Sequence, residues 1–184
     1  MDNKAFTAGV VPGGLTTHRE IKILICCILT TLDAPFKHDL LMDALTAEGM
    51  VNSFEAADAV SDLIDLGHVT ETSGKYQISD TGREIADLLR TDVPLTVRER
   101  VLAKSARLFR RQVNIEQHHV EITERDGGFV VRGSIGDFGV ELFAVEVYAP
   151  NRIHAENIKD NFIDKGADVM RDALSRLIVP AEEV

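Results

Sequence analysis

The sequence has no tryptophan, and aromatic residues make up only 5% of its 184 positions. The core is therefore predicted to be mainly aliphatic. The only two cysteines, Cys26 and Cys27, are adjacent in an apolar run, a spacing that fits neither a disulfide framework nor a metal site. Buried, reduced thiols in a cytoplasmic protein are the prediction. Proline is sparse, which argues against long disordered segments.

Long hydrophobic runs are also missing. The run "IKILICCILTTL" is too short to cross a bilayer and contains Lys22. The first residues, "MDNKAFTAGVVPGG", lack the apolar core of a signal peptide. We therefore expect no association with a membrane.

Basic residues are scarce in the first half of the chain. Residues 1–92 carry 7 Lys and Arg against 15 Asp and Glu, whereas residues 93–184 carry 13 against 15, and the net charge is −10. An acidic protein repels nucleic acid at long range, so any affinity for DNA would need a local basic patch.

Motifs of catalysis are missing too. The sequence has no phosphate-binding loop, paired-glycine nucleotide fingerprint or Ser-His-Asp order. Asp137-Phe138-Gly139 matches the kinase magnesium motif, but the other kinase signatures are absent, and a hairpin turn is expected there. His118 and His119 are adjacent strand residues that should point to opposite faces, as surface histidines. We therefore predict no enzymatic activity, no cofactor and no metal site.

The N-terminal half has the pattern of a DNA-binding domain. Residues 1–16 read as an irregular arm. Residues 17–91 read as helix, helix, helix, hairpin and helix, with a capping box at Thr17 and Glu20, a cap at Asn52, a tight turn at Ser73-Gly74-Lys75 and a helix start at Ser79. This order is that of a winged helix-turn-helix domain.

The first of these helices, residues 17–32, is apolar nearly all round. A small domain rarely buries its first helix so completely. A second subunit or domain is therefore predicted to cover it. The protein is predicted to be a homodimer, with this helix, the apolar seam of residues 169–178 or both at its interface.

The C-terminal half is predicted to be a separate α/β domain. Residues 92–96 read as a linker, and residues 97–184 as a helix over 97–111, a three-stranded antiparallel meander and two helices separated at Lys165-Gly166. The last helix carries an apolar seam of Val169, Met170, Ala173, Leu174, Leu177 and Ile178. The predicted class of the whole chain is α+β.

Two sets of residues carry a family resemblance. The passage Tyr76-Gln77-Ile78-Ser79-Asp80-Thr81-Gly82 is similar to the wing-to-helix segment of PadR-like and MarR-like winged-helix regulators. The runs "FTAGVVPGGLTTHREIKILIC", "GMVNSFEAADAVSDLIDLGHV" and "VPLTVRERVL" resemble a bacterial family of unknown function classed among winged-helix transcriptional regulators. The resemblance implies a DNA-binding regulator, with no ligand or site residues to carry over. That family usually has an aromatic residue where Ser53 stands.

The candidate DNA-binding residues are few. The third helix should bury Ala57, Val60, Leu63 and Ile64, and the opposite face is acidic, so its whole length is not expected to enter the major groove. Its first turn offers free N–H groups suited to a phosphate. Residues 97–111 carry a basic stripe that could bind phosphates or pair with the acidic first half. The candidate contacts are Asn52, Ser53, Lys75, Arg100, Lys104, Arg107 and Arg111.

The prediction from the sequence is a homodimeric transcriptional regulator that binds double-stranded DNA. One alternative is a winged helix used to dock a basic protein partner through the acidic residues Glu55, Asp58, Asp62 and Asp65. Another is a small-molecule sensor that holds its effector in the C-terminal domain.

Overall fold

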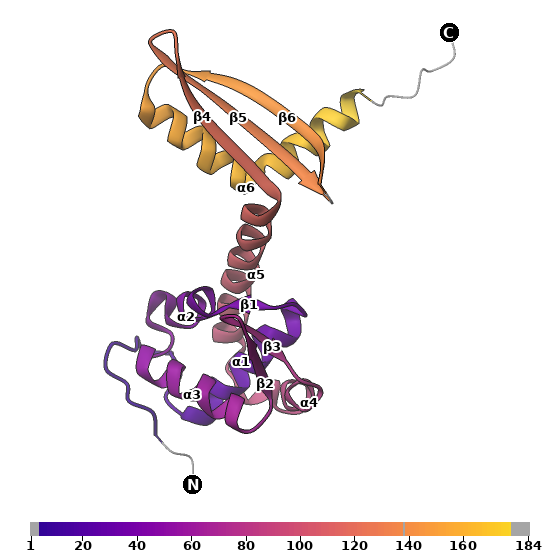
Figure 1. The fold of residues 1–184 in the computed structure, drawn as a ribbon. Coiled ribbons are helices and arrows are strands. Elements are labelled where there is room, and N and C mark those ends of the chain that lie inside the picture. The colour runs from indigo at the N-terminus through magenta and orange to yellow at the C-terminus, as the bar shows by residue number, and fades with distance from the viewer. Residues whose placement is uncertain (1–3, 138, 178–184) are drawn as a thin grey trace. The chain divides into compact units, whose positions relative to one another are not determined.

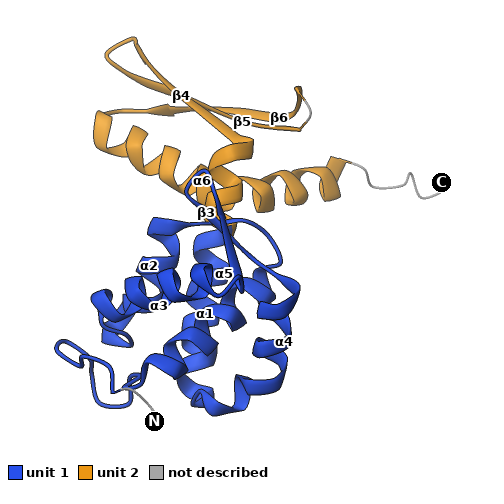
Figure 2. Cartoon of the chain, turned by 60° about the horizontal axis from the view of Figure 1, so that its bottom comes forward, with its two compact units in different colours: residues 1–109 blue, residues 110–184 orange. Residues whose placement is uncertain are grey.

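The computed structural model describes residues 4–137 and 139–177. The chain forms two compact units, residues 1–109 and 110–184 (Figure 2). Both units combine helices with an antiparallel sheet, which agrees with the predicted α+β class. The boundary between the units falls inside a long helix instead of at residues 92–96, because the first turns of that helix pack into the core of unit 1.

Unit 1 is mainly helical (Figure 1). Its three strands form an antiparallel sheet in the order β1-β3-β2. In chain order its elements are α1 (His18–Leu32), β1 (Phe36–Lys37), α2 (His38–Thr46), the 3-10 helix η1 (Ala47–Gly49), α3 (Ser53–Asp65), β2 (Val69–Thr72), β3 (Lys75–Ile78), α4 (Asp80–Leu89), the 3-10 helix η2 (Arg90–Asp92) and the first turns of α5 (Leu95–Gln117).

The starts of the helices follow the predicted caps. Thr17 and Glu20 form the expected capping box, in which the Thr17 hydroxyl accepts from the Glu20 N–H and the Glu20 carboxylate accepts from the Thr17 N–H. Ser79 caps α4 by accepting from the N–H of Gly82. The helix predicted over residues 97–111 is longer in the structure, where α5 spans Leu95–Gln117.

The core of unit 1 surrounds α1. Every residue from Ile23 to Leu29 is buried, as is Ile21. The prediction that a second subunit or domain covers this helix was wrong, because α3, α4 and the start of α5 pack around it within the same unit. Val97 and Val101 of α5 belong to this core. Burial, with a smaller contribution from Cys27, raises the pKa of the Cys26 thiol to about 12, so this thiol is protonated at neutral pH.

Unit 2 is a three-stranded sheet with one long helix against it. The strands form an antiparallel meander in the order β4-β5-β6, as the sequence predicts. The elements after the end of α5 are β4 (His118–Arg125), β5 (Gly128–Asp137), β6 (Val140–Ala149) and α6 (Arg152–Leu177). The predicted hairpin turn at residues 137–139 includes Phe138, which lies outside the described residues.

Helix α6 continues through Lys165-Gly166, so the predicted break and the second helix were wrong. Gly166 is buried, and a Cβ there would lie 3.2 Å from the ring of Phe162. The glycine thus serves close packing inside the helix instead of ending it. Ile178, the last residue of the predicted seam, lies outside the described part of the chain.

The core of unit 2 is small. Its buried apolar cluster consists of Val131, Ala149 and Ala155, with partly buried residues around them. His118 is also buried against the ring of Phe162, with 5.6 Å between centroids, so it is not the surface histidine that the sequence predicted. A cluster of this size leaves much of the apolar surface of the unit uncovered.

Candidate nucleic-acid interface

Asn52 fixes the start of α3 and the N-terminal arm together. Its Oδ1 accepts hydrogen bonds from the N–H groups of Phe54 at 2.9 Å and Glu55 at 3.4 Å, and its Nδ2 donates to the carbonyl of Ala8 at 2.7 Å. The first-turn N–H groups that were expected to be free for a phosphate are therefore partly satisfied by the cap itself. Ser53 beside it is exposed.

Two of the four acidic residues of α3 contact α1, although the side chain of Asp62 is still 45% exposed. The His18 ring, 13% exposed, places Nδ1 3.3 Å from Glu55 Oε2 and Nε2 3.1 Å from Asp62 Oδ2. Lys22 Nζ also lies 3.1 Å from Asp62 Oδ2, and the N–H of Phe6 in the arm donates to Glu55 at 2.7 Å. The predicted acidic stripe is thus partly neutralised inside unit 1.

The other two acidic residues remain exposed. Asp58 has a side chain that is 72% exposed, although its Oδ2 lies 3.7 Å from His18 Nε2, and Asp65 is exposed near the end of α3. Around them the outer face of the helix is uncharged, because it carries Phe54, Ala57 and Ser61. The side chain of Phe54 is 76% exposed.

The sequence interpretation placed the core-facing side of α3 slightly out of phase. Ala57 was expected to be buried and is exposed, whereas Ala56 and Ala59 are fully buried. Alanine gives little hydrophobic contrast, so the pattern could not fix the rotation of the helix to better than one residue. For the same reason Phe54 was not recognised as a surface residue.

Two lysines lie opposite each other where β1 pairs with β3 of the hairpin. Ser73 and Gly74 both have positive φ, 52° and 72°, as a tight two-residue turn requires. Lys75 begins β3 and lies opposite Lys37 of β1. The N–H of His38 donates to the carbonyl of Gly74 at 3.0 Å, which fixes the start of α2 to the hairpin tip. Lys37 was not among the predicted contacts, since a two-residue strand produces no periodic signal.

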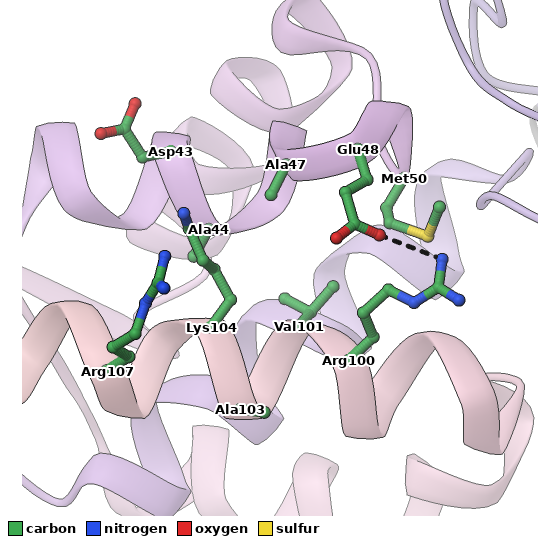
Figure 3. A pocket seen from close by; sticks show the side chains of 10 residues that line it. All are labelled: Asp43, Ala44, Ala47, Glu48, Met50, Arg100, Val101, Ala103, Lys104 and Arg107. Atoms are coloured by element: carbon green, nitrogen blue, oxygen red, sulfur yellow. Dashed lines mark ion pairs between the residues drawn. The ribbon is translucent and has the colours of Figure 1, made fainter.

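The predicted basic stripe of α5 is divided in the structure. Arg111 pairs with Asp164 and, at 3.6 Å, with Asp160 of α6 in unit 2. Arg100 pairs with Glu48 of η1 at 3.2 Å, and Lys104 and Arg107 line the same groove in unit 1 (Figure 3). The four residues therefore do not form one surface for phosphates.

Among the described residues, no group of three or more His, Cys, Asp or Glu side chains is placed to hold a metal ion. No helix of the described part combines the length and apolar character needed to cross a membrane.

The contacts of Asp62 predict how stability depends on pH. Hydrogen bonds from Lys22 and then His18 lower the pKa of Asp62 from 3.8. A carboxyl group whose pKa is lower in the folded state stabilises the fold at any pH above its unfolded-state pKa. This stabilisation is lost as the pH falls through the folded-state pKa. Asp62→Asn should therefore lower the free energy of unfolding at pH 7 by about 0.5 kcal/mol, because solvent screens a side chain that is 45% exposed.

Urea denaturation at pH 7 and at successively lower pH measures the difference in free energy of unfolding between wild type and Asp62→Asn. This difference should shrink below pH 3.8. Asp65→Asn removes the same charge from an exposed site on the same helix, and it should leave stability unchanged. A difference for Asp62→Asn that stays constant with pH would contradict the assigned contacts.

The comparisons with known proteins give one match. The family model described as "Domain of unknown function (DUF4364)" matches residues 21–177. No curated protein matches the chain, and no solved structure does.

Proposed function

The chain belongs to the DUF4364 family, a domain of unknown function, and we propose that it is a homodimeric transcriptional regulator whose unit 1 is a DNA-binding winged helix-turn-helix domain. The observation that carries the proposal is the topology of unit 1. Three helices, the short strand β1 and the β2-β3 hairpin follow the order of a winged helix, with the sheet order β1-β3-β2. In such domains the third helix reads the major groove and the hairpin contacts the backbone.

The charges of α3 fit this use better than the sequence suggested. Contacts with His18 and Lys22 occupy Glu55 and Asp62, so the face of α3 that would meet DNA carries fewer free carboxylates. Its uncharged residues Phe54 and Ser61 can contact base edges and thymine methyl groups. This partial neutralisation supports DNA binding.

The proposed phosphate contacts lie beside the hairpin. Lys75 and its cross-strand neighbour Lys37 place two positive charges next to the exposed turn. Asn52 and Ser53 at the start of α3 are proposed to position that helix against the backbone. We propose a smaller role in DNA binding for the α5 cations, because Arg111 belongs to unit 2 and the other three line a groove between α5 and α2 with η1.

Unit 2 is the proposed dimerisation element. Its apolar cluster is small, and the last turns of α6 extend past the sheet (Figures 1 and 2). Val169, Leu174 and Leu177 are 48%, 41% and 80% exposed on those turns. A second copy that covers them would present two winged helices to half-sites about one helical turn apart.

The test measures how much Lys37 and Lys75 contribute to DNA binding. Lys37→Ala combined with Lys75→Ala should weaken binding to genomic fragments, first recovered by pull-down at low salt, by about tenfold or more. Loss of two phosphate contacts should also make the dependence of log K on log salt shallower by about 2. Fluorescence anisotropy over a salt series measures both quantities.

The matched control removes two lysines from unit 2. Lys159→Ala with Lys165→Ala changes the net charge equally but lies on α6, and it should leave DNA affinity nearly unchanged. The proposal fails if no duplex is retained at low salt, or if the two double variants lose affinity equally.

The alternative of docking a basic partner through α3 has less support. Of its four acidic residues, Glu55 and Asp62 are held against α1, and only Asp58 and Asp65 face outward. Two separate carboxylates make a weak docking surface in water.

A further inference from the structure

A groove in unit 1 lies between α5 on one side and α2 with η1 on the other (Figure 3). Its volume is about 560 Å³, within the range of small-molecule sites. Aliphatic and small side chains, including Ala44, Met50 and Val101, make up part of its lining. These three residues are buried in the core of unit 1, so the groove has a rigid wall.

Cations outnumber carboxylates in this groove. Arg100, Lys104 and Arg107 recur at spacings of four and three along α5, which places them on one side of the helix. Arg100 pairs with Glu48. Within residues 4–137 and 139–177, neither Lys104 nor Arg107 has an ion-pair partner.

The carboxylate of Asp43, the other acidic residue of the groove, does not point toward Lys104 and Arg107. In Figure 3, Lys104 and Arg107 point from α5 toward α2, whereas the carboxylate of Asp43 points away from α5. Two positive charges thus face a space with an aliphatic wall and no neutralising carboxylate. An ammonium and a guanidinium make strong, charge-assisted hydrogen bonds to carboxylate or phosphate oxygens.

We propose that this groove binds a small organic anion. The carboxylate or phosphate group of the ligand lies between Lys104 and Arg107, and its apolar part lies against Ala44, Ala47 and Val101. The Arg100–Glu48 ion pair bounds the site toward η1. The ligand site is therefore in unit 1, not in the C-terminal domain that the sequence favoured for an effector. The proposal does not depend on DNA binding.

The test uses 4-phenylbutyrate, which joins one carboxylate to a small apolar body, and its neutral amide as the matched ligand. Isotope-labelled full-length protein is titrated with each, and amide chemical shifts are followed. The carboxylate should shift residues 43–50 and 100–107, and the amide should bind about tenfold more weakly. Inorganic phosphate alone should bind more weakly than 4-phenylbutyrate, because it leaves the aliphatic wall uncovered.

Two variants separate the site from general charge. The double variant Lys104→Gln with Arg107→Gln should lower the affinity for 4-phenylbutyrate by about tenfold or more. Arg110→Gln, on the same helix but outside the groove, should not change its affinity. The single variant Arg107→Gln serves if thermal unfolding shows that the double variant does not fold.

Three results would overturn the inference. One is a chemical-shift pattern spread over the protein or unaffected by the double variant. Another is an affinity for the neutral amide or for inorganic phosphate equal to that for 4-phenylbutyrate, which would exclude selection of an organic anion by the groove. The third is displacement of 4-phenylbutyrate by duplex DNA with the same loss in the double variant, which would make the groove a contact for the DNA backbone.

Discussion

Replacing Val169 and Leu174 by aspartate should convert the proposed homodimer into a monomer of 20.3 kDa. Both residues lie on the uncovered end of α6, 48% and 41% exposed. Two carboxylates buried without partners in a subunit interface should weaken dimerisation by about 3 kcal/mol or more, which is over a hundredfold in the dissociation constant.

The geometry of α6 gives the reason. Ala155, Phe162 and Gly166 form its buried stripe in unit 2. At 100° per residue the same stripe continues through Met170, Ala173 and Leu177, with Val169 and Leu174 on its edges. The stripe remains apolar after the sheet ends, and Leu177 is 80% exposed. A second copy of this chain can cover it by packing stripe against stripe, as a two-fold interface requires.

Sedimentation velocity at micromolar concentration measures the change. Ile153→Asp is the matched control, because Ile153 is on the same helix and 74% exposed but lies on the side opposite the stripe. It should leave the dimer intact. Wild-type protein that sediments as a 20.3 kDa species would exclude the proposed interface.

The sequence predicted best where a local interaction determines the structure. The capping box of Thr17 and Glu20, the caps at Asn52 and Ser79, and the tight turn before Lys75 depend on neighbouring residues, and all are present. They were enough to place the starts of α1, α3 and α4 and the β2-β3 hairpin. Element order follows from such signals because each one marks the end of a segment.

Predictions that depend on distant packing succeeded less often. The cover of α1 comes partly from Val97 and Val101 of α5, more than sixty residues after it, and nothing near α1 in the sequence indicates this. The use of Gly166 for packing against the ring of Phe162, instead of for ending α6, is likewise not visible in the sequence near it.

The candidate site was limited in the same way. The partners of Glu55 and Asp62 are His18 and Lys22, about forty residues earlier, so a correct reading of α3 as acidic still gave the wrong charge for its surface. The β1–β3 pairing that brings Lys37 opposite Lys75 is equally invisible to a periodic pattern.

Gly82→Ala should destabilise unit 1 strongly, although alanine favours a helix by about 1 kcal/mol over glycine. Gly82 lies in the first turn of α4, where a Cβ would be 2.3 Å from the carbonyl oxygen of His68 and 2.6 Å from Cδ1 of Ile78. The His68 carbonyl is backbone and already accepts from the N–H of Ser79 at 3.0 Å and its hydroxyl at 2.9 Å. It cannot move away without breaking both bonds.

The added methyl group must therefore push α4 from the end of the hairpin. Overpacking of this kind, with the loss of a hydrogen bond, should lower the free energy of unfolding by about 2–3 kcal/mol after the gain in helix propensity. Urea denaturation measures this change at one protein concentration, because the proposed dimerisation would make apparent stability depend on concentration. Gly82 is also the final glycine of the Tyr76–Gly82 passage, so this packing gives a physical reason for that glycine.

Gly166→Ala is the matched control for this prediction. Gly166 is also helical and buried, but the three atoms nearest to its added Cβ all belong to the side chain of Phe162, at 3.2–3.3 Å, and none is a backbone atom. Such a contact requires the ring to move by only a few tenths of an ångström. The gain in propensity then offsets the tighter contact, and stability should stay within about 1 kcal/mol of wild type. Equal stability of Gly82→Ala and wild-type protein would show that the close approach of α4 to His68 does not hold the hairpin in place.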